Sequence, residues 1–241
     1  PEYISFKGGP HTTYDSLTDV TLKEVFDSKS NVWDATITSS AGAIDATRES
    51  NLKCDLSEGV TVEFWLQTGS IASTVTEKQV VFDLWNGVDS GSADYGRLTV
   101  ELTSSGSPFL VTVLSGTTGY TQQSIGSGLD QSTLSDWGHY AFSFSSGSSS
   151  LISTKFYRNG TLNDTLTVGN NIGEILNPIE ARLGALTSPT VDVFAPAGSG
   201  KLSGSLDEFR FWKTRRTSKE IGRYWFTSNL GGGTNTDADN L

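Results

Sequence analysis

The chain has 241 residues, of which 35% are apolar and 10% aromatic, enough for one large domain with a substantial core. A formal net charge of −10 disfavours nucleic acid and anionic lipid as partners, because like charges repel. The single cysteine, Cys54, excludes an internal disulfide, and no apolar run approaches the roughly 18 residues of a membrane span, so we expect no membrane insertion.

Short strand patterns recur along the chain. Residues 1–45 contain two candidates, Tyr3–Phe6 and Val20–Phe26, which we expect to join the main domain or lead into it. Val60–Gln67 alternates apolar and polar residues, which is typical of a strand with one buried face. Asn159-Gly160 is the strongest hairpin signal, because both turn positions need a positive φ. Further strands are predicted at Val80–Trp85, Leu98–Leu102, Phe109–Leu114, His139–Phe144, Lys155–Arg158, Thr161–Val168, Ala181–Leu186 and Gly204–Trp212.

One short helix is predicted near the C-terminus. Thr217 and Glu220 have the spacing of a capping box, in which each side chain accepts a hydrogen bond from the other's backbone amide. An apolar stripe at helical spacing follows, made of Ile221, Tyr224 and Trp225. We therefore expect an all-β, two-sheet antiparallel sandwich over residues 46–228 with one short C-terminal helix. The Gly-rich residues 229–241 are expected to be a linker, and both ends look cut from a larger chain.

Three segments, in order, resemble the laminin-G-like family. They are the strand DLSEGVTVEFW (residues 55–65), the pair WGHYAFSF and FYRNG (137–144 and 156–160), and GSLDEFRFW with the helix start after it (204–221). Together they cover about residues 50–226. The resemblance implies a concanavalin A-like jelly-roll sandwich, and it says little about the ligand, since one fold hosts many functions.

Strand alternation also predicts an ion pair away from the core. Phe209 and Phe211 fall on the core face of the last strand, so Arg210 falls on the other face, as Glu63 does on its own strand. We expect Glu63 and Arg210 to pair under an aromatic layer of Trp65 and Trp212. The alternative is that one of these two tryptophans stacks on a sugar.

No catalytic residue is predicted. Glucan-hydrolysing relatives carry carboxylates at alternate positions of one strand, which places nucleophile and acid on one face. Here Glu63 stands alone, and Asp207 and Glu208 are adjacent, so that they point to opposite faces. Two histidines, His11 and His139, are too few for the usual zinc site, and the resemblance places His139 at a structural strand position.

Calcium is the metal that the resemblance implies. Asp207 matches the family position whose carboxylate often binds a structural Ca²⁺, a cation that prefers six to eight oxygen ligands. The alternative is that Asp207 caps a turn or accepts backbone donors. The tail Asn235–Asn240 imitates the first ligands of a calcium loop but lacks the glycine and glutamate that complete one, which favours a linker.

Ligand-binding residues are expected on loops. The stretch Asp83–Tyr95 mixes aromatic rings with acids and an amide, as sugar stacking with hydroxyl hydrogen bonds or calcium bridging requires. A second such loop is expected at Ser115–Gln123. The alternative is that Trp85 packs in the core and the polar residues only solvate the loops. The candidate ligand-binding residues are Trp85, Asn86, Asp89, Asp94, Tyr95 and Tyr120.

The leading hypothesis is a non-catalytic recognition or adhesion module of a larger extracellular, cell-surface or virion protein. It would bind carbohydrate or a cell-surface protein, with Ca²⁺ as a candidate cofactor. The alternative is a structural virion component, such as a phage decoration, spike or tail module, that contacts only neighbouring virion subunits. A glycoside hydrolase comes third, because the carboxylate spacing is missing.

Overall fold

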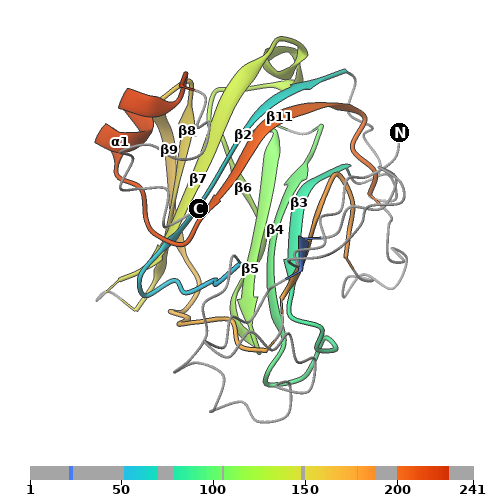
Figure 1. Ribbon diagram of the computed structural model, residues 1–241, viewed down its shortest axis with the longest axis vertical. Coiled ribbons are helices and arrows are strands. Elements are labelled where there is room, and N and C mark those ends of the chain that lie inside the picture. Colours follow the sequence, from blue (N-terminus) through green and yellow to red (C-terminus); the bar gives the residue numbers. More distant parts are fainter. Residues whose placement is uncertain are drawn as a thin grey trace, which may run out of the picture.

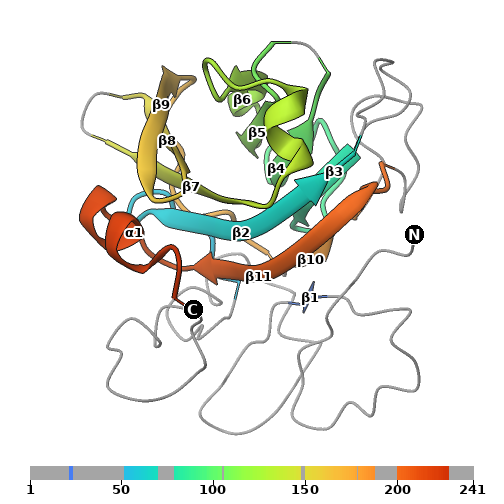
Figure 2. The ribbon, with the colours of Figure 1, turned by 90° about the horizontal axis from the view of Figure 1, so that it is seen from above.

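The computed structural model describes residues 22–23, 52–69, 79–104, 106–147, 150–177, 179–187 and 200–227. In these residues two antiparallel sheets pack face to face (Figures 1 and 2). The all-β sandwich with one short C-terminal helix that the sequence predicts is therefore confirmed. No helix within the described ranges has the length and apolarity needed to cross a membrane.

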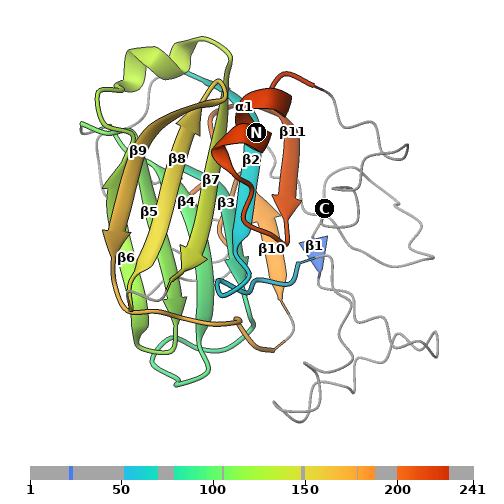
Figure 3. The ribbon, with the colours of Figure 1, turned by 90° about the vertical axis from the view of Figure 1, so that its left-hand side faces the viewer.

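The six-stranded sheet has the order β1–β10–β3–β4–β5–β6, and its neighbours all run antiparallel. Figure 3 shows it behind the other sheet. The two-residue strand β1 is the described part of residues 1–45. The rest of the two strands expected in that range lies outside the described residues. The strands are β1 (Leu22–Lys23), β3 (Gln79–Trp85), β4 (Gly96–Leu102), β5 (Phe109–Ser115), β6 (Thr118–Ile125) and β10 (Glu180–Leu183).

The five-stranded sheet has the order β11–β2–β7–β8–β9. The Asn159-Gly160 turn joins β8 to β9 as predicted, with φ angles of 47° and 75°. The helix α1 begins after Thr217, where the predicted capping box with Glu220 is present. The strands are β2 (Val60–Thr68), β7 (Gly138–Ser146), β8 (Ile152–Arg158), β9 (Thr161–Val168) and β11 (Gly204–Trp212); α1 spans Ser218–Tyr224, and a short 3-10 helix, η2, spans Gln131–Ser135.

The core between the sheets is rich in aromatic rings. Phe142 on β7 is fully buried and lies 4.9 Å from Phe156 and 5.2 Å from Phe109, measured between ring centroids. Phe109 comes from the opposite sheet, so these ring contacts hold the two layers together. On β2 the residues Phe64 and Leu66 face this core, which places their neighbours on the outer face of the sheet.

Strand β11 contains a β-bulge that simple alternation does not predict. The register with β2 shifts between Asp207 and Arg210, and Glu208 has a φ of 49°. Leu206 and Phe209 therefore both pack against the core, although strict alternation puts them on opposite faces. Strict alternation would also put Leu206 on the same face as Arg210, but the extra residue of the bulge switches the faces between them.

The second recognition loop expected at Ser115–Gln123 is a hairpin instead. Residues 118–125 form β6, which pairs with β5. Tyr120 is buried, and its hydroxyl lies 2.6 Å from Thr154 Oγ1 on the opposite sheet. Burial raises the pKa of the Tyr120 hydroxyl. Polar residues around Tyr120 made the segment look like a loop, because β6 is an edge strand whose face away from the core is exposed to solvent.

Truncation of Phe142 tests the aromatic core. We expect Phe142→Ala to lower the free energy of unfolding by about 3–5 kcal/mol, because a large cavity forms between the sheets. Urea unfolding followed by circular dichroism measures this change. Leu162→Ala is the control, since Leu162 is 45% exposed on β9. Equal losses in the two variants would contradict the assigned core.

Candidate functional site

A buried carboxylate lies on the outer face of the five-stranded sheet. Glu63 on β2 has no solvent exposure. Its Oε1 atom lies 2.7 Å from a guanidinium nitrogen of Arg216, and its Oε2 atom lies 3.3 Å from His139 Nε2 and 3.9 Å from Arg210 Nη1. Glu63 and Arg210 are also direct cross-strand neighbours. The predicted Glu63–Arg210 pair is confirmed, and we call these four residues the Glu63 cluster.

The surroundings of Glu63 keep its carboxyl group ionised. Burial alone would raise its pKa, since the charged form loses its hydration. The contact with His139 and the positive charge of Arg216 outweigh this effect and hold the pKa of Glu63 below its usual value. Arg216 was missed by the sequence analysis, because strand alternation says nothing about a residue in the connection between β11 and α1.

A C-terminal segment, residues 213–227, covers this face (Figure 2). Thr61 fixes its first part: the Thr61 hydroxyl donates to the Thr214 carbonyl and accepts from the Arg216 amide. Ile221 of α1 then packs on Ala141 and Tyr157 in a small second core. We call residues 213–227 the C-terminal segment from here on.

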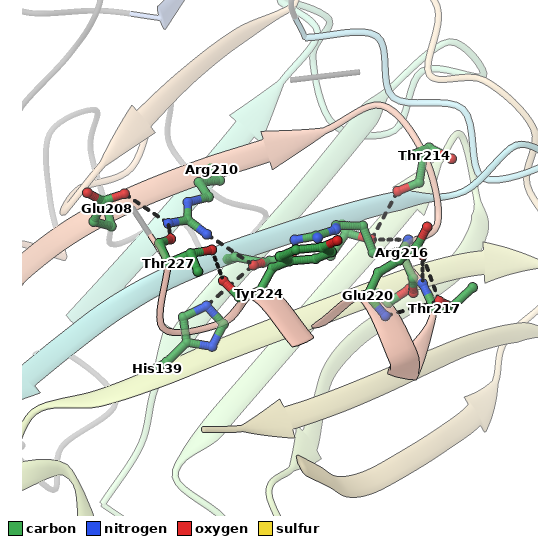
Figure 4. Close-up of polar contacts among 12 residues, drawn as sticks. His139, Glu208, Arg210, Thr214, Arg216, Thr217, Glu220, Tyr224 and Thr227 are labelled. Carbon is green, nitrogen blue, oxygen red and sulfur yellow. Dashed lines mark hydrogen bonds and ion pairs between the residues drawn. The ribbon is translucent and has the colours of Figure 1, made fainter. Parts of the chain in front are cut away.

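The same carboxylate connects to both ends of this segment. Arg216 near its beginning pairs directly with Glu63, while Arg210 donates a hydrogen bond to the Thr227 carbonyl at its end. Arg210 also pairs with Glu208 at 2.9 Å. Figure 4 shows Arg210 and His139 close to Thr227, with Arg216 on the other side beside Tyr224.

Aromatic rings continue from the Glu63 cluster toward solvent. Trp65 on β2 is half-buried and lies 5.6 Å from Trp225, which follows α1; His139 contacts both rings, at 5.7 and 6.1 Å between centroids. Phe226 lies 5.6 Å from Trp225 and is 64% exposed. Rings from β2 and from the C-terminal segment therefore form one continuous group.

Trp137 extends this group along the sheet. It is 46% exposed and lies directly before β7, two residues ahead of His139. The register of β2 with β7 pairs Trp65 with His139 and ends at Leu66 and Gly138, so Trp137 comes next to the last paired position. Gln67 donates to the Ser135 carbonyl and ties down the connection just before Trp137. We call Trp65, Trp137, Trp225 and Phe226 the aromatic surface.

Trp212 is not part of that surface. It has no solvent exposure, and the Arg216 guanidinium stacks over its ring at 4.2 Å. Such cation–π stacking fixes Arg216 in the position from which it reaches Glu63. Of the two tryptophans considered for sugar stacking, only Trp65 reaches solvent.

Hydrogen bonds of a buried side chain hold the predicted loop site between β3 and β4 in place. Asn86 is buried; its Nδ2 donates to the Asp94 and Leu176 carbonyls, and its Oδ1 accepts from the Gly96 amide. Trp85 is half-buried and its indole donates to the Val88 carbonyl. Asn86 therefore shapes the loop and leaves Asp89 and Asp94 exposed at its surface. A ligand role for Trp85, Asp89 and Asp94 stays a prediction.

Tyr95 belongs to a second buried charge group, on the outer face of the six-stranded sheet. The Asp83 carboxylate accepts two hydrogen bonds from Arg97, at 2.9 and 2.6 Å, and two more from the backbone and side chain of Thr187, both at 2.7 Å. Arg97 in turn donates to the Tyr95 hydroxyl at 3.4 Å. This group fixes the chain at Thr187 against the sheet.

Asp207 lies exposed beside the bulge in β11, and its carboxylate accepts from the Glu208 amide at 2.8 Å. This contact is the alternative role that the sequence left open for it. Within the described ranges no three His, Cys, Asp or Glu side chains group closely enough to hold a metal ion. The Ca²⁺ site at Asp207 stays a prediction, and the candidate tail Asn235–Asn240 lies outside the described residues.

A family model described as the concanavalin A-like lectin/glucanases superfamily matches residues 38–222. The chain belongs to this superfamily. The match confirms the laminin-G-like resemblance and the jelly-roll fold. A comparison with curated protein sequences finds no significant match.

Several solved structures are similar to this superfamily member. One is domain 4 of AbnA, a GH43 extracellular arabinanase from Geobacillus stearothermophilus, in complex with arabinotriose; the identity is 17%, the match covers 73% of this chain and 72% of that chain, and the TM-score is 0.41. Another is the receptor binding domain of botulinum neurotoxin C/D mosaic serotype, with 11% identity, 73% and 37% coverage, and a TM-score of 0.44. The chain therefore spans little more than a third of that toxin chain.

Acid titration tests the Glu63 cluster. Because the folded-state pKa of Glu63 is lowered, its stabilising effect is complete above the unfolded value of about 4.5 and is lost as pH falls through the folded-state value. We expect Glu63→Gln to lower the free energy of unfolding by about 3–5 kcal/mol at pH 7, and the difference from wild type to shrink below pH 4.5.

Urea midpoints at pH 7 and at several values below 4.5 measure this effect. Glu58→Gln is the matched control, because the Glu58 side chain is 60% exposed and pairs with Lys53 at the surface. A difference between wild type and Glu63→Gln that stays constant over the whole pH range would contradict the ionised state assigned to Glu63.

Proposed function

We propose that the chain is a non-catalytic recognition module that binds carbohydrate at the aromatic surface. The observation that carries this proposal is the exposure of Trp137 and of Phe226, which contacts half-buried Trp225 and through it Trp65. A contiguous group of exposed apolar side chains on a protein surface marks a place where a ligand or partner binds.

The chemistry of such a surface suits a sugar. A pyranose ring presents a face of C–H groups that packs on an aromatic ring, while its hydroxyl groups stay in water or reach nearby polar atoms. The rings of Trp65 and Trp225 are held by His139 and by the sheet, so little side-chain entropy is lost when a sugar stacks on them. A rigid strand and a docked helix thus support a preorganised surface.

Two of the buried acids, Glu63 and Asp83, argue for recognition without hydrolysis. Hydrolysis of a glycosidic bond uses a pair of carboxyl groups on either side of that bond. The carboxylates of Glu63 and Asp83 are instead fully buried and engaged by arginines. Glu63 holds the C-terminal segment and Asp83 holds the chain at Thr187, so neither carboxylate reaches a bound carbohydrate.

The β3–β4 loop supports a second candidate site. The loop is fixed by Asn86, and it presents the carboxylates of Asp89 and Asp94 to solvent next to half-buried Trp85. Two carboxylates of this kind suit hydroxyl hydrogen bonding or a bridging Ca²⁺. Binding at this loop would depend on calcium, whereas stacking at the aromatic surface would not.

A glycan array with and without EDTA tests the proposal and separates the two sites. We expect binding that survives EDTA and that Trp137→Ala or Phe226→Ala weakens, because the stacking rings are removed. Asp89→Asn and Asp94→Asn serve as controls, and we expect both to bind like wild type.

The other outcomes point elsewhere. Binding that EDTA abolishes and that Asp89→Asn weakens would place recognition at the β3–β4 loop. No binding to any glycan under either condition would overturn the proposal and favour a structural role among neighbouring subunits, as in a virion. An extracellular or cell-surface location follows from the proposed function and is part of the proposal.

A further inference from the structure

The aromatic surface is built from two separate parts of the chain. Trp65 and Trp137 lie on or beside β2 and β7 of the rigid sheet. Trp225 and Phe226 lie in the C-terminal segment, which continues from β11 and is held against that sheet by contacts of side chains such as Thr61 and Ile221. The complete surface exists only while this segment is docked, so the residues that dock it also shape the surface.

Glu63 is the first of these residues. It pairs with Arg216 at 2.7 Å near the beginning of the segment, and with Arg210, which holds the Thr227 carbonyl at the end. One buried carboxylate thus acts on both sides of Trp225 and Phe226. Because it is fully buried, Glu63 contacts no ligand itself.

Gly160 is the second. A Cβ atom placed on Gly160 would lie 2.1 Å from Trp225 Cδ1 and 2.7 Å from its Nε1, far inside contact distance. The Trp225 ring therefore rests directly on the backbone of the β8–β9 turn. Gly222 of α1 also approaches this turn, since a Cβ there would lie 3.1 Å from the Gly160 carbonyl oxygen. The turn needs glycine for its φ of 75°, and the absent side chain makes room for Trp225.

We propose that Glu63 and Gly160 are positioning residues of the aromatic surface, which set its shape through Trp225 and make carbohydrate binding and docking of the C-terminal segment reinforce each other. The proposal rests on the carbohydrate recognition proposed above. A sugar that contacts both Trp137 and Trp225 binds the docked state more tightly than the undocked state. By linkage, the same sugar must then stabilise docking by the same factor.

A pair of glycine variants tests the positioning role of Gly160. Gly160→Ala places a methyl group against Trp225. Gly128→Ala is the matched control: Gly128 has the same φ of 75°, and a Cβ there meets no atom within 4 Å. Both variants carry the same backbone strain, and only one displaces the ring.

Two measurements are made on the full chain. Calorimetric titration with cellohexaose and with arabinotriose gives the affinity, and amide hydrogen exchange of residues 218–227 reports docking with and without each sugar. We expect Gly160→Ala to bind at least about fivefold more weakly than wild type and to exchange faster at 218–227, with Gly128→Ala unchanged. In wild type, a bound sugar should slow exchange at 218–227, which a purely structural role would not produce.

Glu63→Gln is the second variant and decides the question if Gly160→Ala fails to fold. Its affinity should fall and its exchange at 218–227 should rise, as for Gly160→Ala. Trp137→Ala should weaken binding while leaving ligand-free exchange at 218–227 unchanged, because Trp137 lies outside the segment.

Two failures are distinguishable. If wild type binds a sugar and Gly160→Ala binds it equally well, or if the bound sugar leaves exchange at 218–227 unchanged, the positioning role is overturned and the proposed function stands. If wild type binds neither sugar here and no glycan on the array, the proposed function is overturned and the coupling with it.

Discussion

The ion pair between Glu63 and Arg216 is the interaction on which the outer face of the five-stranded sheet depends. A buried carboxylate without partners would destabilise the folded state by several kcal/mol. Burial of Glu63 therefore depends on its pairing with Arg216, which comes from a distant part of the chain. That pairing brings α1, Trp225 and Phe226 to the sheet. A charge that would otherwise disrupt the fold thereby specifies where the C-terminal segment must lie.

Each sheet carries on its outer face a buried acid that pairs with arginine and holds a segment of the chain against the sheet. On the six-stranded sheet, Asp83 gathers Arg97 and the chain at Thr187, just as Glu63 gathers two arginines on the other sheet. Buried ion pairs add little net stability compared with apolar packing, but breaking one is strongly destabilising. We infer that these pairs select one arrangement of the covering segments, while the aromatic core around Phe142 supplies most of the cohesion between the layers.

Much of this fold follows from the sequence, because hydrophobic period and turn chemistry are local properties. Alternation located β2, and it placed Glu63 and Arg210 on one face. The same rule fails within β11, because the bulge at Glu208 adds one residue and reverses which side chains face the core. No pattern in the sequence marks this extra residue. Tyr120 was misplaced because an edge strand with polar residues looks like a loop. The aromatic surface was not predictable: Trp225 reaches Trp65 only through the docking of α1, which depends on Arg216.

The central claim is that Glu63 and Arg216 act as one unit, and a double-mutant cycle measures this directly. Free energies of unfolding are obtained at pH 7 for wild type, Glu63→Gln, Arg216→Met and the double variant. We expect a coupling energy of about 1–3 kcal/mol, because the second substitution removes a partner that has already been lost. Additive effects, within about 0.3–0.5 kcal/mol, would show that the two side chains stabilise the fold independently and would contradict the claim.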